Sequence, residues 1–332
     1  MTIEQSAISE NFSEDSEFIS MHNGKLCAIT RDMKTVLVTG ASGLIGQHLC
    51  KLLETKGYNI HVLGRTKKSH VPYKQFVWDI RNDTIEEGAF NGVSAIIHLA
   101  GANISEGRWT NARKQEIRDS RIKSIKQLFK SIKKASIPLD CFISASAIGY
   151  YGAVTEETIF EESDNPAGDF ISNVCLEWEL AANAFEQAGI RTVKLRTGVV
   201  FTPTGGPLAK MAQPVKLGVG SALGRGDQYM PWIHIGDLCA MYVQSLEKED
   251  MKGPYNAVAP EHATNKAVTK AIGAALNKKV WFPNIPGFLL KIIFGEMAVI
   301  FLEGSRISSD RIQETGFKFA YPNLKKALQD LL

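Results

Sequence analysis

This 332-residue chain is poor in cysteine, in net charge and in long apolar runs, and each shortage excludes a class of protein. Its five cysteines are scattered and form no C-x-x-C pair, which argues against a disulfide framework and against a metal site. The net charge of +3 is too small to indicate nucleic acid or an anionic membrane as a partner. The most apolar late stretch, residues 285–302, is interrupted by Lys291 and Glu296. We therefore expect a cytoplasmic protein that is neither secreted nor inserted in a membrane.

The charge is unevenly distributed along the chain. Residues 1–33 hold six acidic and two basic side chains, a balance of −4, which leaves +7 for residues 34–332. The acidic segment also lacks the regularly spaced apolar positions that offset the entropy of ordering, so we expect a flexible leader at 1–33. Met21 and Met33 are alternative starts to Met1, and the sequence does not choose among them.

From Lys34 onward, short β-branched runs alternate with helical segments, as in a parallel sheet covered by helices on both faces. Strands are predicted at 35–39, 59–63, 75–78, 95–99, 140–145 and 191–196, and helices at 44–56, 110–135 and 172–188. Beyond residue 203 glycine and proline become denser, and helices are predicted at 237–246, 264–276 and 286–302. We expect a doubly wound α/β domain at 34–202 and a smaller α+β substrate or lid region at 203–332.

The predicted helix at 110–135 is rich in lysine and arginine. Isoleucine and leucine recur at near-helical spacing on its other side, at positions 117, 125, 128 and 132, so the basic run is most simply a solvated face. We do not expect this helix to bind nucleic acid.

The strongest chemical motif is V-L-V-T-G-A-S-G-L-I-G at 36–46, where a predicted strand runs directly into a predicted helix. Gly40 can form the tight turn, Gly43 lets backbone N–H groups approach a pyrophosphate, and Gly46 lets the helix pack closely on the strand. The helix N-terminus supplies the anion site. The spacing predicts a Rossmann-like dinucleotide-binding turn, and a purely structural turn would not need all three glycines.

The residues after the second predicted strand indicate which nicotinamide cofactor binds. An NAD site usually places a carboxylate there to accept from the ribose 2′-hydroxyl, but this chain has Gly64 and Arg65, followed by Lys67 and Lys68. A guanidinium can pair with a 2′-phosphate, so NADP(H) is favoured over NAD(H), although these bases can also simply solubilise a loop. Asp79 is a candidate adenine-edge acceptor or a helix cap.

Several motifs together resemble an extended or atypical short-chain dehydrogenase/reductase of the sugar-nucleotide epimerase type: G-A-S-G-L-I-G (40–46), H-L-A-G (98–101), S-A-S-A-I-G-Y-Y-G (144–152) and W-I-H-I-G-D-L (232–238). More narrowly, the chain resembles atypical epimerase-family proteins with a DUF1731-type C-terminal segment, here at about 280–330. The motifs for this subgroup are A-G-A-N-I (100–104), G-D-F-I-S-N-V-C-L-E-W-E (168–179), R-T-G-V-V-F (196–201), G-G-P-L-A-K-M (205–211), A-P-E-H-A-T-N (259–265), F-G-E-M-A (294–298) and L-E-G-S-R (302–306).

The resemblance implies hydride-transfer chemistry and a cofactor site formed by loops after the strands. Its residues are Gly40, Ser42, Gly43, Leu44, Ile45, Gly64, Arg65, Leu99, Ala100 and Gly101, with Val199 and Val200 near the nicotinamide end. It also implies that Glu116 and Arg121 reach the cofactor. Residues five apart on a helix lie about 140° apart around its axis, so periodicity alone would not pair them, and a surface salt bridge is the alternative for both.

Catalysis is where the sequence departs from the wider superfamily. Those enzymes pair a tyrosine with a lysine four residues later, which lowers the pKa of the tyrosine, while a serine polarises the carbonyl. Ser144 and Ser146 are candidates for the serine. The dyad positions hold Ile171 and Cys175, and no lysine occurs between Pro138 and Arg191.

Three interpretations follow. An oxidoreductase or epimerase can use a relocated proton donor, with Ser146, Tyr150, Tyr151 and Asp169 as candidates; Asn103 and Arg108 are candidate substrate ligands, Arg108 as an anion or carbonyl clamp. Tyr151 can instead be structural. The second interpretation is a non-catalytic NADPH-binding or redox-sensing protein. The third is a partner-binding or division-regulating protein with an exposed apolar patch at 288–301. Substrate and oligomeric state, including a homodimer, stay open.

Other candidates have a structural alternative beside the functional one. Trp109 and Trp232 can stack on a substrate ring or pack in the core. His234 and Asp237 are expected to be a packed histidine and a helix cap, and His98 a core residue with satisfied hydrogen bonds. Cys175, if it lies beside the nicotinamide, is a candidate oxidisable thiol.

Overall fold

The computed structural model describes residues 19–22, 25–28, 34–69 and 71–332. The chain divides into two compact units, residues 1–33 and 34–332. In the first, β1 (Ile19–His22) and β2 (Lys25–Ala28) pair as antiparallel strands. The rest of the predicted flexible leader lies outside the described residues.

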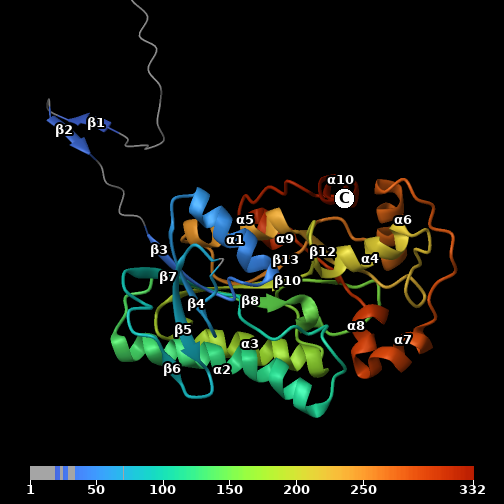
Figure 1. Ribbon diagram of the computed structural model, residues 1–332, viewed down its shortest axis with the longest axis horizontal. Coiled ribbons are helices and arrows are strands. Elements are labelled where there is room, and N and C mark those ends of the chain that lie inside the picture. Colours follow the sequence, from blue (N-terminus) through green and yellow to red (C-terminus); the bar gives the residue numbers. More distant parts are fainter. Residues whose placement is uncertain (1–18, 23–24, 29–33, 70) are drawn as a thin grey trace, which may run out of the picture. The chain divides into compact units, whose positions relative to one another are not determined.

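An eight-stranded sheet forms the centre of the second unit, with the order β13-β10-β8-β7-β3-β4-β5-β6 (Figure 1). Neighbouring strands are parallel except β6, which runs antiparallel to β5. The six predicted strands are confirmed, with ends that shift by one or two residues. The bounds are β3 Thr35–Thr39, β4 Asn59–Gly64, β5 Lys74–Asp79, β6 Thr84–Ile85, β7 Val93–His98, β8 Cys141–Ala147, β10 Arg191–Thr197 and β13 Gly253–Ala257.

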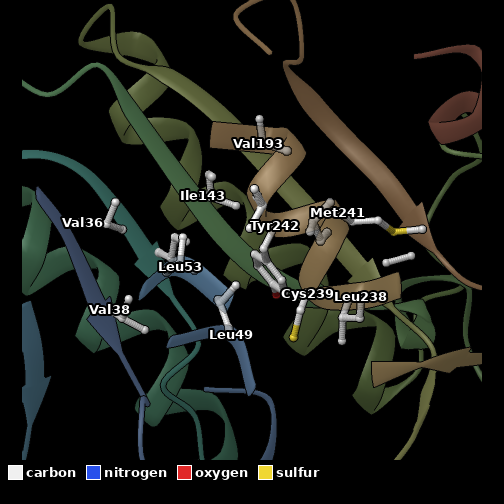
Figure 2. Packing of buried hydrophobic residues seen from close by; sticks show 14 of the residues in the cluster. Val36, Val38, Leu49, Leu53, Ile143, Val193, Leu238, Cys239, Met241 and Tyr242 are labelled. Atoms are coloured by element: carbon white, nitrogen blue, oxygen red, sulfur yellow. The ribbon is translucent and has the colours of Figure 1, made fainter. Parts of the chain in front are cut away.

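Helices cover both faces of this sheet, as the alternation of strands and helices predicts. Successive side chains of a strand point to opposite faces, so Val36 and Val38 pack against α1 (Leu44–Thr55) and α5 (Ile235–Glu247), as Figure 2 shows. Leu37 packs on the other face with α2 (Asn111–Ala135) and α3 (Phe170–Gln187). On that face Phe142 stacks on Phe185, with ring centroids 3.8 Å apart. Burial on both faces explains why the strands read as nearly continuous apolar runs.

The second half of the chain contributes to this core and also forms a separate apolar cluster, which includes Phe201, Trp232 and Leu328. Its β13 and α5 join the central sheet and its helical cover. Its other elements are β11 (Val199–Phe201), paired with β12 (Trp232–His234), α4 (Gly206–Lys216), α6 (Asn265–Ala275), α9 (Asp310–Glu314) and α10 (Leu324–Leu331). The domain boundary at residue 202 stays a prediction.

The expectation of one helix at 286–302 is wrong. Three short helices occupy this stretch: α7 (Gly287–Phe294), the 3₁₀ turn η2 (Gly295–Ala298) and α8 (Val299–Leu302). Gly295 has φ +61°, outside the right-handed helical region, and this breaks the helix. Within 34–69 and 71–332 no helix is long and apolar enough to cross a bilayer.

Candidate functional site

Most of the predicted cofactor residues lie at or just after the carboxyl ends of parallel strands and therefore along one edge of the sheet, whereas Glu116 and Arg121 lie within α2. The chain goes from β3 to its neighbour β4 and outward to β6, then crosses back to β7 on the other side of β3. A reversal of this kind opens a crevice at the strand ends, which is where doubly wound sheets bind ligands. The glycine turn follows β3 directly, so it lies at this crevice.

Each glycine of the turn makes room for a different contact. Gly40 has φ +74°, and a Cβ there would lie 2.9 Å from the backbone N of Ala100. At Gly46 a Cβ would lie 2.4 Å from the Gly40 carbonyl oxygen, so this glycine is required for packing of α1 on the turn. Gly43 is the N-cap of α1, with no side-chain cap and no acid in the first turn. Its own N–H donates to the Gly40 carbonyl oxygen at 2.9 Å, so the N–H groups of Leu44 and Ile45 are the ones left to face an anion. The geometry agrees with the predicted tight turn at Gly40 and close packing at Gly46, and the approach of a pyrophosphate at Gly43 stays a prediction.

The end of β4 carries the cation that sequence analysis singled out. Arg65 is exposed and has no hydrogen-bond or ion-pair partner among the described residues. Lys67, by contrast, pairs with Glu86 at an Nζ–Oε1 distance of 2.7 Å, so its charge is already balanced. At the end of β5, Asp79 accepts two backbone N–H bonds, the shorter at 2.7 Å, and these lower its pKa. Asp79 thus holds a turn, and its contact with adenine stays a prediction.

The loop after β7, which contains Leu99, is fastened to the glycine turn through β3. The hydroxyl oxygen of Thr39 accepts from the Leu99 and Ala100 N–H groups at 3.2 Å and donates to His98 Nδ1 at 2.8 Å. His98 Nε2 then donates to the Ser124 hydroxyl at 3.0 Å. Burial lowers the pKa of His98 to about 3, so the ring is neutral and every polar atom is used. The prediction of a core histidine with satisfied hydrogen bonds is confirmed.

Arg121 and Glu116 have different surroundings. The Arg121 guanidinium carbon would lie 3.2 Å from a Cβ on Gly101, and it sits 4.9 Å from the Trp178 ring centre. Burial lowers the pKa of Arg121, which has no carboxylate partner in the described part of the chain. Glu116 is exposed and pairs with Arg113 at 2.6 Å. The salt-bridge alternative therefore fits Glu116 and not Arg121; their contacts with a cofactor stay predictions.

Ile171 and Cys175, which sequence analysis aligned with the catalytic dyad, lie in an apolar cluster. A Cβ on Gly149, in the 3₁₀ turn η1 (Ile148–Tyr151), would lie 2.3 Å from Ile171 Cγ2 and 3.6 Å from Cys175 Sγ. Both side chains are buried, together with Trp109 and Tyr150. Burial raises the pKa of the Cys175 thiol to about 12, so it is not a ready thiolate.

Next to this cluster lies a buried polar network that sequence reasoning missed. Arg196 donates through Nε and Nη2 to the Glu179 carboxylate, at 2.8 and 3.0 Å, and through Nη1 to the Tyr151 hydroxyl at 2.8 Å. Tyr151 in turn donates to Asn256 Oδ1 at 2.7 Å, and Ser146 donates to Glu179 at 2.7 Å. Tyr151 is fully buried, which raises its pKa. The hydroxyls of Ser146 and Tyr151 are thus both committed within the protein.

The remaining catalytic and substrate candidates have structural partners. Asp169 is the N-cap of α3, accepting from the Ser172 N–H at 2.8 Å. Arg108 donates to the carbonyl oxygens of Ile292 and Ile293 at the end of α7. The Asn103 side chain accepts from Ser105.

The two tryptophan candidates both pack in the protein. Trp232 is fully buried against Phe201 and has no exposed face for a substrate ring, so the core alternative holds for it. Trp109 is 7% exposed and packs edge-on against Phe170. Val199 and Val200 are half-buried in β11, just past the end of β10.

His234 and Asp237 anchor the C-terminal segment. His234 is the N-cap of α5, accepting from the Gly236 N–H at 3.0 Å, and its Nε2 contacts Asp330 at 3.1 Å. Asp237 accepts from the N–H groups of Ala320 and Tyr321. The packed histidine is confirmed, but the cap is His234 rather than Asp237.

A parallel sheet with a glycine turn at its switch point defines a dinucleotide-binding fold. Residues 36–258 match the model of the NAD dependent epimerase/dehydratase family, and residues 285–331 match a domain of unknown function, DUF1731. The chain belongs to the NAD dependent epimerase/dehydratase family.

Relatives and solved structures agree with this assignment. The human epimerase family protein SDR39U1 is 33% identical over 303 residues, covering 90% of this chain and 99% of the relative. The Bacillus subtilis protein YfhF is 33% identical over 301 residues, covering 90% and 97%. A crystal structure of human SDR39U1 with NADPH matches with a TM-score of 0.81 at 31% identity, covering 90% and 98%. Thermus thermophilus UDP-glucose 4-epimerase, at 22% identity and a TM-score of 0.70, shares the fold.

Proposed function

We propose that this protein is an NADP(H)-binding, epimerase-like oxidoreductase whose substrate is a carbonyl compound or sugar nucleotide. The glycine turn at the switch point carries the proposal, because a Cβ at Gly40 or Gly46 would collide with backbone atoms and only glycine permits this tight strand-to-helix turn. The relative of known structure that was solved with NADPH supports the choice of cofactor. Within residues 34–332 the cysteines are free and buried, which supports a reducing, cytoplasmic location; they are Cys50, Cys141, Cys175 and Cys239.

Selection of NADP(H) over NAD(H) rests on Arg65. It is an exposed cation without a partner among the described residues, at the strand end where an NAD site needs an acid. NADPH, when bound here, supplies a hydride. In this proposal the N–H groups of Leu44 and Ile45 would face the pyrophosphate, Arg65 would face the 2′-phosphate, and Val199 and Val200 would flank the nicotinamide end.

The proton-transfer group differs from that of the wider superfamily. Ile171 and Cys175 replace the tyrosine and lysine, and the hydroxyls of Ser146 and Tyr151 are held by Glu179 and Asn256. Tyr150 is the remaining candidate donor, since its hydroxyl has no hydrogen-bond partner among the described residues. The committed hydroxyls also favour a second candidate function, a non-catalytic NADPH-binding or redox-sensing protein.

The cofactor proposal is tested by calorimetric titration of the full chain with NADPH and with NADH. NADPH should bind more tightly, and Arg65→Ala should remove roughly tenfold or more of that preference. Lys67→Ala is the matched control, because its ammonium is paired with Glu86 and should matter less. Equal affinities for the two nucleotides in the wild type would contradict the role of Arg65, and failure of both to bind would end the enzyme proposal.

Catalysis is tested separately with the NADPH complex. Carbonyl compounds and sugar nucleotides are screened for loss of absorbance at 340 nm and for deuterium transfer from labelled NADPH. Tyr150→Phe should lower kcat about 100-fold or more while leaving NADPH affinity unchanged, if Tyr150 is the donor. Unchanged kcat in that variant would exclude Tyr150, and no transfer to any compound would favour the non-catalytic function.

A further inference from the structure

An exposed apolar face covers α7 and the segment before it. Among its side chains Trp281 is 70% exposed, Phe288 62% and Ile292 63%. The docking face comprises Trp281, Phe282, Phe288, Leu289, Ile292 and Ile293. So many exposed apolar side chains within 13 residues are costly to leave in water, so they indicate an interaction surface.

The fold holds this face outward. Residues 288, 289, 292 and 293 are neighbours on one side of a helix, whereas Leu290 points inward and is 5% exposed. Arg108 fixes the end of α7 through the carbonyl oxygens of Ile292 and Ile293. Figure 1 shows α7 at the periphery of this unit, beside α8. The helix is thus folded, anchored and apolar on its outer side.

The charged side chains of the segment that carries this face have one sign. Between Glu261 and Glu296 the chain contains five lysines and no acidic residue. Three of them, Lys278, Lys279 and Lys291, are exposed and lie next to the apolar residues in sequence. Lysines that flank exposed aromatic and aliphatic side chains are typical of surfaces that bind anionic lipid, where tryptophan sits at the headgroup level.

We infer that the docking face binds peripherally to the surface of an anionic phospholipid bilayer, with α7 lying in the plane of the interface. Eight residues give α7 a length of only about 12 Å, so it cannot span the hydrocarbon core. A second copy of this chain fits the face less well, because a two-fold contact would bring the lysines of both copies together without an acid in the segment to pair them. This inference does not depend on the proposed function.

Trp281 provides a direct readout of binding. The other four tryptophans are at most 7% exposed, so a change in fluorescence on adding vesicles reports on Trp281. With the full chain and vesicles of phosphatidylcholine mixed with phosphatidylglycerol, we expect a blue shift and quenching by brominated lipid, both weakened at high salt. Trp281→Phe should remove the signal but not co-sedimentation. No shift and no co-sedimentation with these vesicles would overturn the inference.

Substitutions separate the apolar and electrostatic contributions. Phe288→Asp with Ile292→Asp should weaken co-sedimentation about tenfold or more, while Leu180→Asp, at a site 56% exposed on α3, should not. Reversing Lys278 and Lys279 to Glu should weaken binding about tenfold.

Reversal of the exposed lysines at 133 and 134 on α2 is the matched control for the electrostatic test and should leave binding unchanged. If both charge reversals weaken vesicle co-sedimentation equally, the docking face is not the site of lipid binding. The wild type could instead fail to bind vesicles and sediment as a dimer in sedimentation velocity. If the Phe288 and Ile292 substitutions then convert this dimer to a monomer, the face binds a second copy of the chain.

Discussion

Arg196 and Glu179 form a bidentate ion pair between β10 and α3, with Nε–Oε1 and Nη2–Oε2 distances of 2.8 and 3.0 Å and side chains only 3% and 8% exposed. The guanidinium carbon also lies 3.5 Å from the Tyr150 ring centre. Two hydroxyls that sequence analysis considered as proton donors, those of Ser146 and Tyr151, are hydrogen-bonded to it. The ion pair therefore fixes the positions of the Ser146 and Tyr151 side chains.

Removal of one partner should be costly. Glu179→Ala leaves a buried guanidinium without a counter-charge and should lower the free energy of unfolding by about 3–5 kcal/mol, measured by urea denaturation. Glu177→Ala on the same helix is the control, since Glu177 pairs with Arg118 at the surface and its loss should cost at most about 1 kcal/mol. Similar losses in the two variants would show that burial does not set the strength of the pair.

The glycine turn allows stability to be separated from nucleotide binding. Gly46→Ala forces a methyl group to within 2.4 Å of the Gly40 carbonyl oxygen, so we expect a loss of about 1–3 kcal/mol in unfolding free energy. At Gly43 a Cβ meets only that same oxygen, at 3.2 Å, so Gly43→Ala should be milder for stability and should mainly lower NADPH affinity. The opposite ranking, with Gly43→Ala the less stable protein, would contradict these assigned roles.

The fold and the cofactor turn were predictable because their patterns are local. Strand β3 and helix α1 follow from a β-branched run, three spaced glycines and an amphipathic segment, all within 21 residues of sequence from Thr35 to Thr55. The family resemblance rested on the same short motifs. Arg65 could be identified because its position is fixed by the length of one βα unit.

Contacts between distant segments could not be read from the sequence. Glu179 and Arg196 look like an ordinary helix glutamate and a strand arginine until the fold places them together. Strand β13 contains Gly253 and Pro254, which a strand pattern disfavours, yet it pairs with β10 because the edge of the sheet is open there. Arg108 holds the end of α7 through the carbonyl oxygens of Ile292 and Ile293, a contact between segments that are far apart in sequence.

His98 should make the protein sensitive to acid. Its pKa of about 3 in the folded protein lies below the ordinary value of 6.5. As the pH falls from 6.5 toward 3, His98 is therefore protonated in the unfolded chain but stays neutral in the folded protein. Between pH 6.5 and 5 this costs about 2 kcal/mol of stability. Burial lowers the pKa of His61 and His234 as well, so the comparison needs His98→Gln, which should show a shallower loss in urea midpoints over this range. An identical pH dependence in this variant would mean that His98 is protonated in the fold.

Alkylation of Cys175 tests whether reagents in solution reach the region around Ile171 and Cys175. Its thiol is 3% exposed, and burial raises its pKa to about 12, so the native protein at pH 8 should leave Cys175 unalkylated by iodoacetamide while the urea-unfolded chain reacts fully. Mass spectrometry of the peptide containing residue 175 measures this directly. NADPH should not change the result, because the thiol is covered by Ile171 and η1 rather than by a cofactor. Rapid native labelling that NADPH blocks would instead place Cys175 in the nicotinamide pocket and revive the redox-sensing function.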